Sequence, residues 1–105
     1  MRTKKKSAAI TYLEKLNGGP FTFAQMIESF RLCEEMSQTS FAKMLGISRA
    51  HLCDIEKGRR FVSVERAVHF AKALGWPPHT FIRLALQDQV SRAGLRYSVD
   101  LHKAA

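Results

Sequence analysis

The sequence has no uninterrupted apolar run near the roughly 20 residues that crossing a bilayer takes, and it has only two cysteines. Cys33 and Cys53 have neither the spacing of a zinc site nor the density of a disulfide scaffold. We expect both to be small buried apolar side chains, with a redox pair as the alternative. Glu14 and Lys15 interrupt the apolar stretch that a signal peptide would need after the charged start. We therefore expect a reduced, cytoplasmic protein.

Acidic residues are also scarce, with 9 Asp and Glu against 17 Lys and Arg and a formal net charge of +8. This excess favours an anionic partner, most commonly nucleic acid, although an anionic membrane or an acidic protein would also satisfy it. His51 and Cys53 lie two positions apart on a predicted helix and diverge by about 200°, so they cannot share a ligand. Paired carboxylates and histidine clusters at usable spacing are missing, so we expect no enzyme, no metal and no cofactor.

What is present is a globular pattern of 46% hydrophobic and 25% charged residues, enough for one modest core in 105 residues. Capping residues and glycines predict five helices, at residues 22–35, 38–45, 49–57, 64–74 and 79–90. Because the loops between them are short, we expect an all-α domain over residues 21–90. Aromatic residues at helical spacing are predicted to form its core: Phe23, Phe30, Phe41, Phe70 and Phe81.

The flanking segments differ from this central domain. In residues 1–20 we expect a basic arm, which is either a solvated terminus or a contact to DNA, and a short helix capped by Ser7. In residues 91–105 apolar and polar residues alternate, which predicts a β-strand. A lone strand is unstable, so it either folds back on its own domain or, as we expect, pairs with a second copy. The predicted dimerisation residues are Leu95, Tyr97, Val99 and Leu101.

The most informative stretch is 37–60, where two capped helices are separated by a short turn at Gly46. Such a turn sets two helices roughly perpendicular, so that the second can protrude into a groove. At 100° per residue, Leu52 and Ile55 point into the bundle. The opposite face, which is either a DNA-reading surface or a solvated basic one, carries Arg49, Ala50, Cys53, Asp54 and Lys57.

The outward residues suit the major groove of duplex DNA. Arg49 can donate twice to a guanine, Ala50 can contact a thymine methyl group, and Asp54 can accept from a cytosine amine or reject wrong bases. Gln38 stands at a helix start, where free backbone N–H groups favour a phosphate. Further phosphate contacts are expected from Lys57, Arg59 and Arg60.

The pattern Ser-Gln-x-x-Phe-Ala-x-x-Leu-Gly-Ile-Ser-x-x-x-Leu-x-x-Ile-Glu-x-Gly-x-Arg, beginning at Ser37, resembles the Xre family, the lambdoid phage-repressor type of helix-turn-helix. The resemblance runs from about Phe23 to Phe81 and implies a five-helix lambda-repressor-like domain. It also implies a structural ion pair between Arg31 and Glu56. Val62 stands where the family usually has proline. The positions implied to lie at or near DNA are Gln38, Lys43, Arg49, Ala50, Cys53, Asp54, Lys57, Arg59 and Arg60.

By this resemblance we expect a nucleoid-associated transcriptional regulator, a repressor that binds a palindromic operator in double-stranded DNA as a homodimer. The flanks, 1–20 and 91–105, are not general to the family. An added amino-terminal helix and carboxy-terminal strand resemble the antitoxin branch, whose members also bind and neutralise a small RNase toxin. A type II antitoxin that autoregulates its own operon is therefore the alternative function.

Overall fold

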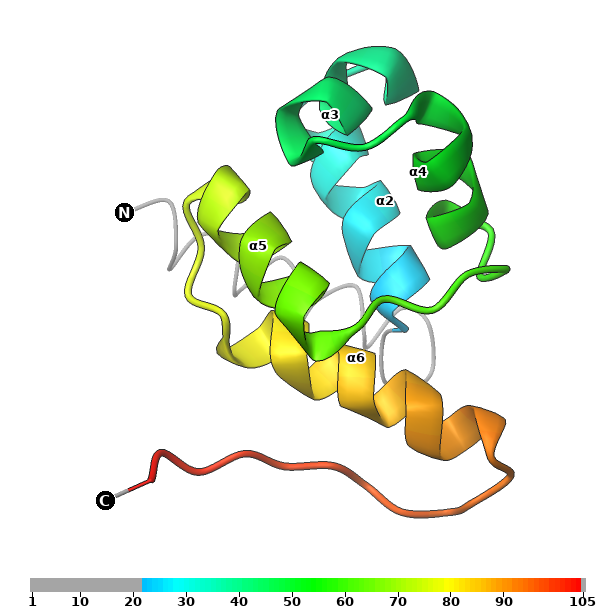
Figure 1. Ribbon diagram of the computed structural model, residues 1–105, viewed down its shortest axis with the longest axis vertical. Coiled ribbons are helices and arrows are strands. Elements are labelled where there is room, and N and C mark those ends of the chain that lie inside the picture. Colours follow the sequence, from blue (N-terminus) through cyan, green and yellow to red (C-terminus); the bar gives the residue numbers. More distant parts are fainter. Residues whose placement is uncertain (1–21, 105) are drawn as a thin grey trace.

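The computed structural model describes residues 22–104, and all regular secondary structure in that range is helical. Figure 1 shows the five helices: α2 (Phe23–Cys33), α3 (Gln38–Leu45), α4 (Arg49–Glu56), α5 (Val64–Leu74) and α6 (His79–Arg92). The expected all-α class and all five central helices are confirmed. α3 and α5 have the predicted bounds, whereas α2 and α4 end slightly early and α6 runs slightly further. The predicted basic arm and amino-terminal helix lie outside the described residues.

Hydroxyl side chains fix where four of these helices begin. The Thr22 hydroxyl accepts from the Gln25 backbone N–H at 3.1 Å, and the Gln25 amide oxygen accepts from the Thr22 N–H at 3.0 Å, which makes a capping box. Ser37, Ser48 and Ser63 each accept from the backbone N–H three residues further on. Each such bond satisfies a helix donor that otherwise has no partner in the helix, and loss of such a cap costs about 1 kcal/mol. These starts are therefore encoded locally.

Left-handed residues stand at or just after the C-terminal cap of all five helices. Gly46 and Gly75 close α3 and α5 at φ of 76° and 73°, a region that glycine enters without a steric cost. After α2 the same conformation is taken by Glu35, at φ 56°, and the Met36 N–H then returns to the Arg31 carbonyl. This turn explains why α2 ends before Glu35, and it also directs the Met36 carbonyl at the Arg31 guanidinium, 3.1 Å away.

A single core joins all five helices. All five phenylalanines that the sequence placed in the core are buried, and Trp76, from the loop between α5 and α6, joins them. The Phe30 ring packs edge-on against Trp76 at 4.8 Å and lies 5.6 Å from the Phe81 ring. α3 and α4 are anchored in this core by the buried side chains of Leu45, Leu52 and Ile55. The helix-turn-helix is therefore supported by the whole bundle.

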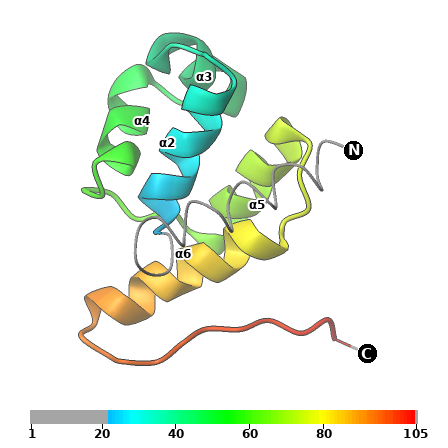
Figure 2. The same cartoon turned by 180° about the vertical axis from the view of Figure 1, so that it is seen from behind.

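The carboxy-terminal tail departs from expectation. Residues 95–101 return alongside α6 as an extended segment (Figures 1 and 2), with no paired strand among the described residues. The β-strand predicted here is not supported, because a strand needs a neighbouring strand and residues 22–104 supply none. The Gln87 side-chain amide holds the tail instead. Its Nε2 donates to the Tyr97 carbonyl at 2.9 Å, and its Oε1 accepts from the Val99 N–H at 2.7 Å.

Candidate nucleic-acid interface

Three neighbouring residues form the turn between α3 and α4, and each has a different structural role. Gly46 supplies the left-handed conformation, the partly buried Ile47 packs against the core, and Ser48 caps α4. The Gly46 N–H donates to the Lys43 carbonyl and the Ile47 N–H to the Ala42 carbonyl, at 3.1 and 3.0 Å, which satisfies two of the last carbonyls of α3. The orientation of α4 is therefore set by backbone bonds and packing.

The face of α4 that was predicted to point outward does so. Leu52 and Ile55 are buried, as expected, and the residues on the opposite side of the helix are exposed or half-buried. On that side Arg49, Ala50 and Lys57 are exposed, while Cys53 and Asp54 are half-buried. The geometry that a groove-binding helix needs is thus present.

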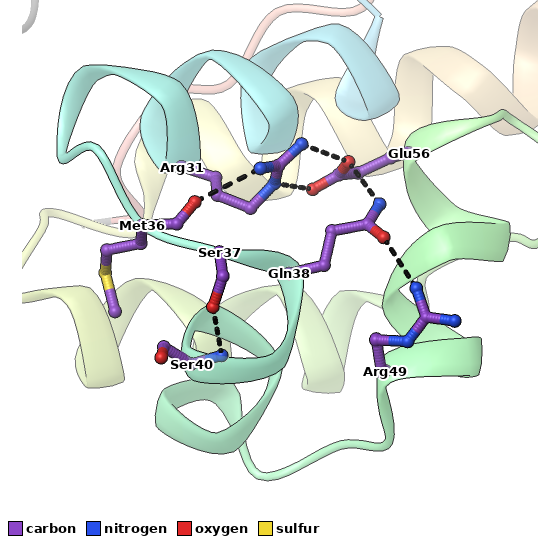
Figure 3. Close-up of polar contacts among 7 residues, drawn as sticks. All are labelled: Arg31, Met36, Ser37, Gln38, Ser40, Arg49 and Glu56. Atoms are coloured by element: carbon purple, nitrogen blue, oxygen red, sulfur yellow. Dashed lines mark hydrogen bonds and ion pairs between the residues drawn. The ribbon is translucent and has the colours of Figure 1, made fainter.

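A chain of polar contacts runs from the bundle interior to this outward face (Figure 3). Arg31 Nε and Nη2 donate to the two carboxylate oxygens of Glu56 at 2.8 and 3.1 Å, which confirms the expected ion pair. The Gln38 Nε2 donates to Glu56 Oε1 at 3.0 Å, and the Gln38 Oε1 accepts from Arg49 Nη1 at 3.1 Å. The Glu56 and Arg31 side chains are 3% and 13% exposed, whereas Arg49 lies at the surface. A buried carboxylate therefore positions an exposed guanidinium.

This chain changes the role expected for Gln38. The resemblance placed Gln38 among the DNA-facing residues, and both ends of its side-chain amide are engaged by Glu56 and Arg49. Glu56, the acceptor of Gln38, is also bonded to Arg31. The Arg31 guanidinium donates twice to the Glu56 carboxylate, and this raises the pKa of Arg31 above its usual value although burial acts to lower it. Gln38 is therefore a residue that orients Arg49. The free backbone N–H groups at the start of α3, which favour a phosphate, are separate from this side-chain network.

Asp54 and Arg59, which were assigned to bases and phosphates, contact each other. Arg59 Nε and Nη2 both donate to Asp54 Oδ1, at 3.2 and 3.1 Å. The side chains are 61% exposed for Arg59 and 44% for Asp54, and such a surface pair contributes little to stability. The pairing leaves Asp54 Oδ2 without a donor among the described residues. Oδ2 is the atom that can accept a hydrogen bond from a base.

Sequence reasoning missed the contribution of α5 to this surface. Arg66 Nη1, in the first turns of α5, lies 3.5 Å from His51 Nδ1 on α4. Burial lowers the pKa of His51, and the nearby charges of Arg60 and Arg66 lower it further, which favours the neutral form of the ring. Arg60 and Arg66 therefore add positive charge beside α4. Arg66 reaches His51 because α3 packs against both α4 and α5, and no sequence motif marks it.

The loop after α4, which carries the predicted phosphate contacts, is held from the far end of α6. The Arg92 guanidinium lies 4.1 Å from the centre of the Phe61 ring and donates to the Gly58 carbonyl. Asp88 lies one helical turn before Arg92 on α6. Burial raises the pKa of its carboxyl group, while a hydrogen bond from the Phe23 backbone N–H and the charge of Arg92 lower it. α6 thus ties together the start of α2 and the loop that follows α4.

The remaining predicted positions have simpler environments. Lys43 is exposed in the last turn of α3. Cys53 is half-buried and Cys33 is exposed at the end of α2, so the expectation that Cys33 is a buried side chain is wrong. Among residues 22–104, no group of three or more His, Cys, Asp or Glu side chains could hold a metal ion. No helix in that range is long and apolar enough to span a membrane.

Comparison with known proteins agrees with this geometry. A family model described as "Helix-turn-helix" matches residues 27–81, which is more than half of the chain and contains α3, the turn and α4. No curated protein matches the chain significantly. The matched region includes the capped helices, the Gly46 turn and the exposed face of α4. With that match and this architecture, the chain belongs to the Xre (lambda-repressor-like) family of helix-turn-helix DNA-binding regulators.

Proposed function

We propose that this protein is a non-catalytic, sequence-specific repressor that binds a palindromic operator in duplex DNA as a homodimer. The observation that carries the proposal is the outward face of α4, on which Arg49 is held by Gln38, which is itself held by Glu56. An arginine presented in this way can donate to the O6 and N7 of a guanine, the commonest specific contact in the major groove. In a dimer, two such helices would enter successive major grooves about 34 Å apart.

Phosphate contacts supply most of the affinity in this proposal. Lys57, Arg59 and Arg60 follow one another closely at the end of α4, and all three are exposed. Together with Arg66, these residues place positive charge around the outward face of α4. Binding should therefore weaken steeply as salt rises, because each phosphate contact releases counterions. Selection of duplexes from a random pool would identify the operator, and equal binding to selected and scrambled duplexes would contradict sequence-specific recognition.

Lys57→Ala is expected to weaken binding to all sequences alike and to flatten the salt dependence. A single lost phosphate contact lowers the slope of log K against log salt by about 0.9. The measurement is fluorescence anisotropy on operator and scrambled duplexes at several salt concentrations. Lys72→Ala is the matched control, because Lys72 is an exposed lysine near the end of α5. A Lys57→Ala loss confined to the operator would contradict its assignment to phosphate.

Arg92→Ala is expected to weaken DNA binding by roughly two- to fivefold, the value of a surface cation–π contact. The loss should be equal on operator and scrambled duplexes, because the loop that Arg92 holds carries phosphate contacts. Phe61→Ala removes the other half of the contact without changing the charge. If Arg92 acts by positioning the loop, both variants lose the same affinity and the double variant loses no more. A normal affinity for Phe61→Ala would show that the ring contact is not needed and that Arg92 acts through its charge or its bond to the Gly58 carbonyl.

The antitoxin alternative stays a prediction. It is tested by co-expression with the adjacent gene, since an antitoxin would co-purify with its toxin. A toxin-free dimer that represses normally would count against it.

A further inference from the structure

The hydrogen bonds of the carboxy-terminal tail fall on alternate residues. Tyr97 uses its carbonyl and Val99 its N–H, both toward Gln87, and the Leu101 carbonyl lies 3.3 Å from His79 Nε2. In an extended segment the N–H and C=O groups of alternate residues point to the same edge. The edge defined by residues 97, 99 and 101 is therefore the one that faces α6. Figures 1 and 2 show the tail beside α6, at the end of the molecule away from α3.

The opposite edge belongs to Arg96, Ser98 and Asp100. The backbone N–H and C=O groups of these three residues make no hydrogen bond to any described residue. An extended segment with one satisfied and one open edge is a template for another strand. Leu95 and Tyr97 are also 50% and 69% exposed, which is high for large apolar side chains. The tail thus has the features of an edge strand without its neighbour.

The charges along the open edge identify which strand fits it. We propose that this edge pairs antiparallel with the same edge of a second copy, with Ser98 opposite the partner's Ser98. In that register Arg96 lies opposite the partner's Asp100, and Asp100 lies opposite the partner's Arg96. The edge is therefore complementary to itself, as a twofold interface requires. This inference rests on the homodimer of the proposed function and adds its register and its residues.

Other registers lose this complementarity. A shift by two residues sets Arg96 opposite the partner's His102, and a shift the other way sets it opposite the partner's Ser98. A shift by one residue turns Tyr97 and Val99 toward the partner, although their groups are already bound by Gln87. Among residues 22–104, the Asp100 carboxylate contacts the exposed His102 ring at 3.6 Å and the Leu101 N–H. The partner's Arg96 can therefore replace His102 at small cost.

Charge exchange tests the register in the full-length protein. Arg96→Asp and Asp100→Arg each place like charges across both symmetry-related pairs, so each should raise the dimer dissociation constant by about tenfold or more. The double variant restores opposite charges and should return the constant to within about threefold of the parent. Lys103→Asp makes the same charge change at another exposed tail position and should leave dimerisation unchanged. Analytical ultracentrifugation measures the dissociation constants of the parent and the four variants.

Cross-linking gives a second, independent measurement. Residues that exchange both hydrogen bonds in an antiparallel pair have Cα atoms about 5.5 Å apart, within the range of a disulfide. In a Cys33→Ser, Cys53→Ser background, Ser98→Cys should therefore form a covalent dimer on mild oxidation, and His102→Cys should not. A monomeric parent protein, a dimer that neither charge reversal weakens, or cross-linking at residue 102 in place of 98 would each overturn the inference.

Binding to a duplex with a single half-site separates this inference from the proposed function. If half-site binding is retained and the dimer tests fail, the strand pairing is wrong and DNA recognition stands. If the dimer forms in the stated register and no duplex is selected, the pairing stands and the proposed function is wrong.

Discussion

Glu56→Ala is expected to lower the free energy of unfolding by about 3 kcal/mol, because removal of one partner from a buried ion pair leaves the other charge uncompensated. Glu56 accepts from both Arg31 and Gln38, and its side chain is 3% exposed. For a domain of this size the loss corresponds to a fall in melting temperature of about 12–24 °C. Thermal unfolding followed by circular dichroism measures it. A melting temperature within about 3 °C of the parent would contradict the role of this carboxylate.

Two variants separate the stabilising role of Glu56 from its role in recognition. Glu65→Ala removes an exposed carboxylate in the first turn of α5 and should cost at most about 1 kcal/mol, the value of a helix-dipole interaction. Arg31→Met combined with Glu56→Leu replaces the ion pair by apolar groups of similar volume and should recover much of the stability. The double variant should still discriminate operators poorly, because Gln38 no longer has its acceptor. Full discrimination by the double variant would show that the ion pair serves stability alone.

Arg49→Ala is expected to abolish the preference for one base pair in each half-site while the other positions keep theirs. Loss of a bidentate contact to guanine costs about 1–3 kcal/mol of discrimination. That energy corresponds to roughly a 5- to 150-fold change in relative affinity. Competition assays on operators substituted at each position in turn make the measurement. Equal losses at every position would contradict the assignment of Arg49 to a base.

Gln38→Ala tests how Arg49 is positioned. It keeps the arginine but removes the acceptor 3.1 Å from Nη1, so the guanidinium regains rotational freedom before it binds. The expected result is a smaller loss at the same base pair that Arg49→Ala affects. Combined with Arg49→Ala, the Gln38 substitution should add no further loss, since the two residues act as a unit. A loss at a different base pair would show that Gln38 contacts DNA independently.

Features encoded by neighbouring residues were predictable from the sequence. The hydroxyl caps at Ser37, Ser48 and Ser63 and the left-handed glycines Gly46 and Gly75 marked helix ends that the structure confirms. Periodicity then placed the phenylalanine core and the outward face of α4. In each case the cause acts within a few residues, so the chain reveals it without a tertiary structure.

Features that depend on tertiary contacts were missed or misjudged. Arg66 meets His51, and Arg92 reaches Gly58, only because helices distant in sequence are packed together. The prediction of a β-strand in the carboxy-terminal tail failed for a different reason. Alternation at residues 95–101 predicted a β-strand, which the structure does not support, and alternation cannot show that Gln87 of α6 would supply the hydrogen bonds of this segment. Periodicity thus reports conformation and leaves the identity of the neighbour open.

The Gln38 side-chain amide can take only one orientation in the polar network. A carboxylate can only accept hydrogen bonds, so Glu56 requires the NH₂ end of the amide, and the oxygen end must turn toward residue 49. An acidic residue at position 49 would then meet an oxygen, and the amide could not rotate without facing Glu56 with that oxygen. The interior of the protein thereby disfavours acidic side chains at position 49. New operator preferences based on an acceptor at this position would first require a different residue at 38.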